Sequence, residues 1–427
     1  MEVSTSPEKE QALIVALETE DNAGEEINFS LNELRLLADS AGATVVHQAV
    51  QKRQKPHPRC YIGEGKAQEI AALCEELDIS LVIFDDELSP GQVRNLEKII
   101  PVKILDRPQV ILDIFAQKAH TKEGKLQVEL AQLQYLLPRL TGKGVELSRL
   151  GGGIGTRGPG EKLLEVQRRR INDRITALKK QIEDIRKKRK VQRSPREKIP
   201  IPLAALVGYT NAGKSTLLNT MTDASVFAED KLFATLDPTV RKLELPGNKT
   251  ILLSDTVGFI NKLPHTLIAA FRATLEEVQT ADYLVHVVDA SHEHCEKQIA
   301  SVKEVLHELE VHEKPVIYVF NKKDLVSEPS LLERLLSKYT PSVAVSARHN
   351  DNVEEMLDLL YRFERENYEE MEILLPFDKY DKIQYIFQEG EVLSQKTLPQ
   401  GIYLKISVAR RYVHHLEPYR YQSNVKH

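Results

Sequence analysis

The stretch of residues 203–221 constrains the fold of this 427-residue chain more than any other feature. An apolar, strand-like run leads directly into the pattern G-x-x-x-x-G-K-S, and a helix-like run follows it. This order of strand, glycine-rich loop and helix is the setting that a phosphate-binding P-loop requires. The loop turns backbone N–H groups toward phosphate oxygens, and the helix N-terminus adds a positive dipole. We predict that nucleotide phosphates bind at Gly208, Tyr209, Thr210, Asn211, Ala212, Gly213, Lys214 and Ser215.

The chemistry of this loop implies a magnesium nucleotide. Lys214 supplies a point charge for the β- and γ-phosphates, and Ser215 offers a hydroxyl to Mg²⁺. A second apolar run ends at Asp255, which is placed to hold Mg²⁺ through a water. Gly258 completes a D-x-x-G motif and brings a backbone N–H to the γ-phosphate. The rest of this predicted contact segment is Thr256 and Val257.

Two later motifs select the base, because a P-loop alone does not distinguish GTP from ATP. A strand-like run over residues 315–320 ends in the pattern N-K-x-D, whose Asp324 carboxylate can accept from the N1–H and 2-amino groups of guanine. A backbone N–H after the next strand can contact guanine O6. We predict base contacts at Asn321, Lys322, Lys323, Asp324, Ser346, Ala347 and Arg348. The motifs together predict a guanine-nucleotide-binding GTPase domain.

The remaining Mg²⁺ ligand is expected in the segment of residues 233–239, which contains two threonines. Thr235 precedes Asp255 by enough residues for two antiparallel strands, whereas Thr239 leaves less room. We therefore predict Thr235 as the second hydroxyl ligand and, with Lys214 and Gly258, as part of the catalytic set. The neighbouring nucleotide contacts are predicted at Phe233, Ala234, Leu236 and Asp237.

Composition places the chain among soluble, intracellular proteins. Hydrophobic residues make up 41% and charged residues 28%, which is ordinary for a globular protein. The three cysteines form no C-x-x-C pair, so a disulfide framework or a zinc site is not expected. Neither a signal peptide nor an apolar run of membrane-spanning length is evident. We expect a cytoplasmic location, with association to ribosomes or a membrane surface left open, and a monomer.

The region before the P-loop shows two kinds of pattern. Strand-like runs alternate with helical spacing up to about residue 115, which predicts a parallel sheet. Ser30 and Glu33 have the spacing of a capping box, so a helix is expected to start there. A helical stretch, a glycine-dense loop over residues 151–160 and a long polar helix follow. Its apolar positions have coiled-coil spacing and are expected to pack on a helix near residues 126–140.

The predicted fold class is therefore α/β: a P-loop GTPase domain with a mostly parallel sheet, preceded by an α/β N-terminal domain with a long helical hairpin. A small α+β domain follows it, where residues 401–408 alternate like a strand. The predicted boundaries are 1–115 for the N-terminal domain, 116–198 for the helical segment, 199–367 for the GTPase domain and 368–427 for the C-terminal domain.

Several segments together resemble the HflX family, in the translational GTPase superfamily, over nearly the whole chain. They include residues 61–66, Asp106-Arg107, the glycine loop before the long helix, residues 233–241, 255–259 and 270–276. The resemblance implies a GTP-hydrolysing factor that binds the large ribosomal subunit and splits stalled or idle ribosomes under stress. Two other readings stay open: a GTP-dependent switch for a protein or membrane partner, and an ATP-driven RNA remodeller.

Residues near the glycine-dense loop are candidates for RNA contact. Arg149, Arg157 and Lys162 combine positive charge with a flexible backbone, which suits contact with RNA phosphates. A mobile linker between domains is the alternative for this loop. The basic run at residues 186–190 has an equally simple explanation, a solvated helix end that complements its own dipole.

The predicted active site lacks one familiar catalytic group. Ras-like enzymes carry a glutamine after the D-x-x-G glycine to orient the attacking water, but this chain has Phe259 there. We therefore expect a low intrinsic rate of hydrolysis that a partner stimulates, as the resemblance implies. A second hypothesis is a K⁺ ion, coordinated by Asn211, that assists the reaction.

Overall fold

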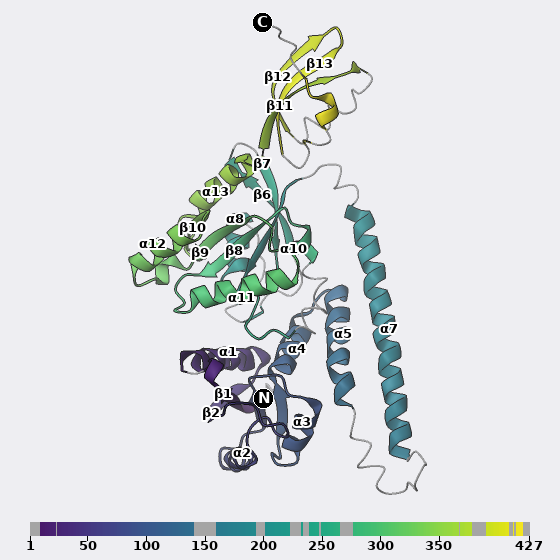
Figure 1. Cartoon of the computed structure of the whole chain (residues 1–427), viewed down its shortest axis with the longest axis vertical. Helices are drawn as coiled ribbons and strands as arrows, with labels where there is room; N and C mark the ends of the chain where they lie inside the picture. The colour runs from purple at the N-terminus through teal and green to yellow at the C-terminus, as the bar shows by residue number, and fades with distance from the viewer. Residues whose placement is uncertain are drawn as a thin grey trace, which may run out of the picture.

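The computed structural model describes residues 9–22, 24–140, 159–193, 201–222, 232–233, 239–246, 249–264, 276–366, 368–377, 390–409, 413 and 416–421. Three sheets follow one another along the longest axis of the molecule (Figure 1). The N-terminal sheet lies at one end, the sheet that carries the P-loop is in the middle, and the C-terminal sheet lies at the other end.

The N-terminal sheet is parallel throughout, in the order β2-β1-β3-β4. Its strands are β1 (Gln11–Glu18), β2 (Thr44–Lys52), β3 (Leu81–Phe84) and β4 (Lys103–Asp106). The first helices are η1 (Glu20–Asn22), α1 (Glu25–Ala41), α2 (Glu64–Glu76) and α3 (Pro90–Glu97). The chain runs from β1 to β2 on one side and then to β3 on the other, so the strand order reverses between β1 and β3. In open α/β sheets, a crevice forms at the carboxyl ends of two such strands.

The predicted start of α1 is wrong. The helix begins at Glu25, after Gly24, which has a positive φ of 68°. Glu25 and Glu26 in its first turn suit the positive end of the helix dipole. Ser30 and Glu33 lie inside α1, and both are buried. Their spacing places them on one helix face, where Ser30 contacts Asp85, just after β3, and Glu33 contacts Arg107, the first residue of α4.

Three helices continue the chain toward the P-loop: α4 (Arg107–Lys118), α5 (Lys122–Arg139) and the long α7 (Pro159–Arg193). Helices α5 and α7 lie side by side as a hairpin along the side of the molecule (Figure 1). The apolar seam of α7, which includes Ile175, Leu178 and Ile182, packs on Leu126 and Leu130 of α5. The predicted intramolecular packing of this helix is therefore confirmed.

The middle sheet has the order β10-β9-β8-β5-β7-β6, and only β6 is antiparallel to its neighbour. Its strands are β5 (Leu203–Gly208), β6 (Thr239–Leu245), β7 (Lys249–Asp255), β8 (Tyr283–Asp289), β9 (Val316–Asn321) and β10 (Ser342–Ala344). The helices of this region are α8 (Lys214–Thr222), α10 (Glu276–Thr280), α11 (Cys295–Glu308), η4 (Lys323–Leu325), α12 (Pro329–Lys338) and α13 (Val353–Glu366). The carboxyl ends of five strands therefore share one edge.

The C-terminal sheet is antiparallel, in the order β11-β13-β12. It consists of β11 (Tyr368–Leu375), β12 (Gly390–Leu398) and β13 (Gly401–Ala409), followed by the short η6 (Glu417–Tyr419). The strand predicted over residues 401–408 is confirmed, and the whole agrees with the predicted fold class. The domain boundaries themselves stay predictions.

Candidate functional site

The P-loop joins β5 to α8 through a turn that few residues can form. Gly208, Asn211 and Gly213 have positive φ angles of 154°, 60° and 91°. A Cβ atom on Gly208 would lie 2.2 Å from the backbone oxygen of Val287 on β8. Only glycine fits there, because both the backbone angle and the close approach of β8 exclude a side chain.

Lys214 is buried inside the loop at the start of α8. Its Nζ donates to the backbone oxygens of Gly208 at 3.1 Å and Tyr209 at 2.9 Å. Burial lowers the pKa of Lys214 to about 8, and the negative charge of Asp255 only partly offsets this effect. Phosphate oxygens would favour the charged form of the amine, so the site is built to bind an anion.

The predicted magnesium ligands meet at the ends of β7 and the P-loop. Ser215 Oγ donates to Asp255 Oδ2 at 2.6 Å. A hydroxyl and a carboxylate are the hard oxygen donors that Mg²⁺ prefers, so this pair fits the predicted ion. Thr256 follows Asp255 and donates from Oγ1 to the backbone oxygen of Leu206 at 2.6 Å, which fixes β7 against β5.

The D-x-x-G segment continues from β7 and lies against the P-loop. The N–H of Phe259 donates to the oxygen of Gly208 at 3.1 Å, and the N–H of Thr210 donates to the oxygen of Phe259 at 2.7 Å. A Cβ atom on Gly258 would meet Thr210 Cα at 2.8 Å. The Phe259 side chain is buried. A phenyl ring has no polar atom with which to orient water, so Phe259 contributes backbone groups only.

The two base-reading motifs come together through Asn321 at the end of β9. Its Nδ2 donates to the backbone oxygen of Ala212 in the P-loop at 2.9 Å. Its Oδ1 accepts from the N–H of Ala347 at 3.0 Å. The neighbouring Lys322 Nζ lies 2.7 Å from Asp289 Oδ2 at the end of β8. The phosphate loop and the base loops are thus joined at one edge, although the role of each residue stays a prediction.

Some predicted residues lie outside the described part of the chain: Thr235, with Ala234, Leu236 and Asp237, and the RNA-contact candidates Arg149 and Arg157. The side chain of Lys162, in α7, is not described either. Phe233 is described and buried, and its ring packs on Phe115 of α4 with centroids 4.6 Å apart. Thr239 is the first residue of β6 and pairs in register with Asp255.

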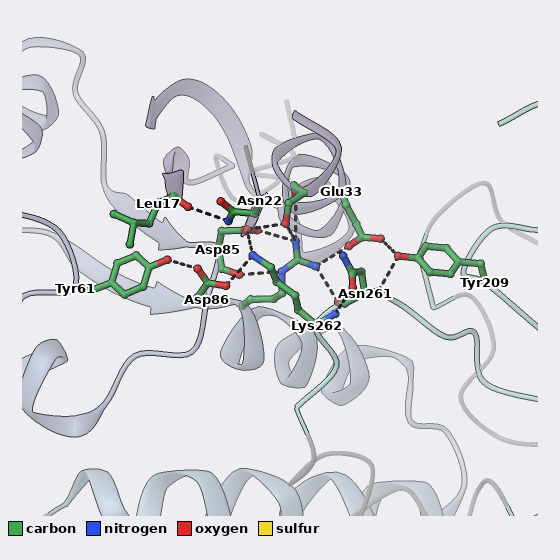
Figure 2. Close-up of polar contacts among 11 residues, drawn as sticks. Leu17, Asn22, Glu33, Tyr61, Asp85, Asp86, Tyr209, Asn261 and Lys262 are labelled. Carbon is green, nitrogen blue, oxygen red and sulfur yellow. Dashed lines mark hydrogen bonds and ion pairs between the residues drawn. The ribbon is translucent and has the colours of Figure 1, made fainter. Parts of the chain in front are cut away.

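A second cluster of polar residues lies where the N-terminal sheet meets this site (Figure 2). Arg107 is 1% exposed and pairs with Glu33 and Asp85, each at 2.7 Å. Burial alone would raise the pKa of Asp85, but Arg107 and Lys262 outweigh it and hold that pKa below its usual range. Burial raises the pKa of Glu33, and Arg107 opposes this only in part.

Sequence reasoning did not assign this cluster. Asp85 and Asp86 directly follow β3, and Arg107 directly follows β4. Charged residues just after the ends of two adjacent parallel strands are the signal that could have indicated it.

The fold and the site together define the class of protein. A mostly parallel sheet carries a P-loop, a D-x-x-G segment and an N-K-x-D loop, all at the carboxyl ends of its parallel strands. This is the architecture of a GTP-hydrolysing P-loop enzyme. Among the described residues, no helix combines the length and apolar character needed to cross a membrane.

Comparisons with known proteins agree with this class. Family models match residues 28–116 as a GTP-binding GTPase N-terminal region, 118–196 as a GTP-binding GTPase middle region, and 203–322 as a 50S ribosome-binding GTPase. The GTPase HflX of Lacrimispora saccharolytica is 48% identical over 400 residues, with 94% of each chain covered. The GTPase HflX of Escherichia coli is 47% identical, with 75% of this chain and 74% of that one covered. The chain belongs to the HflX family of GTPases.

A solved structure is also similar. It is a GTP-binding protein from Sulfolobus solfataricus in complex with GDP, 27% identical, with a TM-score of 0.43. The match covers 83% of this chain and 98% of that one.

Proposed function

We propose that this GTPase binds the large ribosomal subunit and splits or recycles stalled or idle ribosomes under stress. The match of residues 203–322 to a 50S ribosome-binding GTPase model supports the choice of partner. The single structural observation that carries the proposal is the basic surface of α7. The protein acts in the cytoplasm as a monomer and contacts both ribosomal RNA and protein.

Helix α7 has the charge expected of a surface that meets RNA. Between residues 165 and 188 it carries nine basic side chains and four acidic ones. All but Arg186 among these basic residues are exposed, and the apolar seam on the opposite face is covered by α5. RNA phosphates attract such a surface, and binding weakens as salt rises. The predicted contacts of Arg149, Arg157 and Lys162 would extend it.

Co-sedimentation with 50S particles tests this binding directly. The full chain with a non-hydrolysable GTP analogue should sediment with 50S particles, and binding should fall as salt is raised. The triple variant Arg168→Glu, Arg169→Glu, Arg170→Glu should bind more weakly. A matched control with Lys242→Glu, Lys338→Glu and Arg362→Glu changes the same number of exposed charges on the middle region. Absence of binding to 50S particles would exclude the ribosome as the partner and favour a switch for another protein.

The splitting activity needs its own measurement. Addition of the protein with GTP or its analogue should dissociate 70S ribosomes into subunits, which light scattering follows in real time. Binding to 50S particles without any loss of 70S scattering would leave a ribosome-bound switch and refute the splitting step.

The site supports slow hydrolysis that the partner accelerates. Lys214 and Gly258 are proposed to hold the γ-phosphate, while Ser215, Asp255 and Thr235 hold Mg²⁺. Mg²⁺, when bound, neutralises the charge that develops on the phosphates. Phe259 cannot orient the attacking water, and the proposal is that the ribosome orders the site for this step. GTPase rates should therefore rise when 50S or 70S particles are added, and equal rates would contradict this part of the proposal.

A potassium ion is a further proposed cofactor. Asn211 is exposed in the P-loop, where its backbone has a positive φ of 60°. Its amide oxygen is a suitable ligand for such an ion. Hydrolysis should be faster in potassium than in sodium buffer, and Asn211→Ala should abolish the difference. Equal rates of the unmodified protein in both buffers would end this hypothesis.

A further inference from the structure

Asp289 lies beside the base-reading loop, at the end of a strand that carries none of the GTPase motifs. It is the last residue of β8, and it pairs in register with Asn321, the first residue of the N-K-x-D motif. The N–H of Ala290 donates to the backbone oxygen of Asn321 at 2.9 Å. The parallel pairing of β8 and β9 thus holds Asp289 next to the motif.

Both oxygens of the Asp289 carboxylate have partners. Oδ1 accepts from the N–H of Ser291 at 3.1 Å and from Ser291 Oγ at 2.6 Å. Oδ2 lies 2.7 Å from Lys322 Nζ. The bonds to Ser291 form a local turn of the kind that aspartate side chains favour. The carboxylate is therefore held in one orientation by its own loop, with its second oxygen available to the lysine.

The Lys322 side chain is held at both of its ends. Its backbone is in the left-handed region, with φ 61° and ψ 34°, and its carbonyl oxygen accepts from the N–H of Leu325 at 2.9 Å. A residue other than glycine persists in this region only where its surroundings hold it there. The ion pair with Asp289 fixes the other end. The aliphatic stem of Lys322 therefore runs between two fixed points.

This ion pair is shielded from solvent more than its neighbour in the same motif. The side chain of Asp289 is 14% exposed and that of Lys322 is 24% exposed. Lys323, the next residue, pairs with Asp351 at 2.9 Å, but the Asp351 side chain is 59% exposed. Solvent and salt screen the second pair more strongly than the first. Two adjacent lysines therefore differ in how firmly a carboxylate holds them.

We propose that Asp289 is a positioning residue for guanine nucleotides, which holds the stem of Lys322 in place to cover the face of the base. This role rests on the predicted contact between Lys322 and the base, whereas Asp324 is predicted to read the edge of guanine. A stem that is already fixed loses little conformational freedom when the base binds. Asp289 thus strengthens binding of the nucleotide without touching it.

The two residues of the motif contact different parts of the base, and this difference gives the test its readout. Lys322 covers the face of the purine ring, which guanine and hypoxanthine share. Asp324 reads the 2-amino group, which hypoxanthine lacks. Release of the Lys322 stem should therefore weaken binding of GDP and inosine diphosphate by the same factor, because the binding-competent fraction falls for both. A general disturbance of the base loop would instead change the ratio of the two affinities.

Asp289→Asn tests the proposal in the full-length chain, because asparagine keeps an oxygen for Ser291 and removes the charge. GDP and inosine diphosphate should both bind about three- to tenfold more weakly, which calorimetry measures. KM for GTP should rise by the same factor while kcat stays within about twofold of the original, because the phosphates are bound by another loop. Lys322→Met breaks the same ion pair from the other side and should give the same loss.

A double variant shows whether Asp289 acts through Lys322. Lys322→Ala removes the stem itself and should weaken GDP binding at least as much as Asp289→Asn does. Adding Asp289→Asn to Lys322→Ala should cause no further loss, because the group that Asp289 positions is already absent. If Lys322→Ala left GDP affinity unchanged, the lysine would not cover the base, and the proposal would be refuted while the GTPase assignment stood.

The matched control is Asp351→Asn, which makes the same chemical change beside the next lysine of the motif. GDP affinity should stay within about twofold of the original. Four outcomes would overturn the proposal: unchanged affinity in Asp289→Asn, an altered ratio of GDP to inosine diphosphate affinity, a further loss in the double variant, or an equal loss in Asp351→Asn. Should Asp289→Asn not fold, Lys322→Met decides by the same ratio.

Discussion

The N-terminal sheet and the mostly parallel middle sheet both place functional groups just after the carboxyl ends of their strands, but these groups carry opposite charge. In both, the groups that contact a neighbour follow the carboxyl ends of the strands. The middle sheet carries a glycine-rich turn and buried Lys214, which suit an anionic phosphate. The N-terminal sheet carries Asp85 and Asp86, and the side chain of Lys262 lies against them. The strand order of a sheet determines where a charged group can bind. The residues that follow the strands determine whether that group is an anion or a cation.

The largest expected effect is a loss of stability when the polar cluster of the N-terminal sheet is broken. Arg107→Met leaves Glu33 and Asp85 buried without their main cation, and such an uncompensated pair lowers the free energy of unfolding by about 3–5 kcal/mol. Urea denaturation followed by circular dichroism measures this loss. The control Arg174→Met breaks an exposed ion pair with Glu129, which solvent screens, so it should lower the free energy of unfolding far less. If both variants lost the same free energy of unfolding, burial of the Arg107 ion pairs would not contribute to stability.

The second largest effect is expected at the phosphate site of the middle sheet. Lys214→Ala removes the buried charge from the phosphate site, and kcat/KM for GTP should fall by about 10²–10³-fold. Lys242→Ala, at an exposed position of β6, should change kcat/KM by less than about twofold. Rates of phosphate release measure both. ATP hydrolysis should be negligible in the unmodified chain, and ATP turnover that also depends on Lys214 would instead support an ATP-driven remodeller.

Base recognition should be separable from phosphate binding. Asp324→Asn replaces an acceptor pair with an amide that can donate to the 2-oxygen of xanthine. GTP affinity should fall by about tenfold or more, and xanthosine triphosphate should become the better ligand. Asp351→Asn removes a carboxylate that pairs with Lys323 at 2.9 Å and should leave the preference unchanged. Unchanged GTP binding in Asp324→Asn would show that another group reads the base.

The smallest expected effect is a pH dependence at the phosphate site. The pKa of Lys214 is lowered to about 8 in the free protein, and bound phosphate should raise it, so binding takes up a proton above that pH. GDP affinity should therefore fall by about three- to fourfold between pH 7 and pH 8.5. Calorimetry at pH 8 in buffers of different ionisation enthalpy should detect the proton uptake. A binding enthalpy that is independent of the buffer would contradict this pKa.

The sequence predicted the middle sheet well because its signals are local. The P-loop, the D-x-x-G segment and the N-K-x-D loop each follow a strand within a few residues, so position along the chain implies position in space. The apolar seam of α7 is predicted for the same reason. Its spacing indicates both that the segment is helical and which face of the helix packs on α5. The structure adds that Asn321 bonds to Ala212, a contact between segments far apart in sequence.

The polar cluster around Arg107 could not be predicted in the same way. Glu33 and Arg107 are joined only when α1 and α4 pack together, and Lys262 comes from another domain. Local spacing suggested instead that Ser30 and Glu33 cap a helix. Tertiary contacts overrode that local preference, because two polar residues on one helix face serve equally well to bind a buried arginine.

Asn321 has a wider consequence for how this protein can be altered. Its amide holds the phosphate loop and the base loop at once, and a Cβ atom on Gly213 would lie 2.2 Å from its Nδ2. Any side chain introduced at Gly213 would push this amide aside and disturb the guanine pocket from a distance. Variants selected for weaker phosphate contact at that position should therefore also lose discrimination between bases, so the two traits cannot be engineered independently through Gly213.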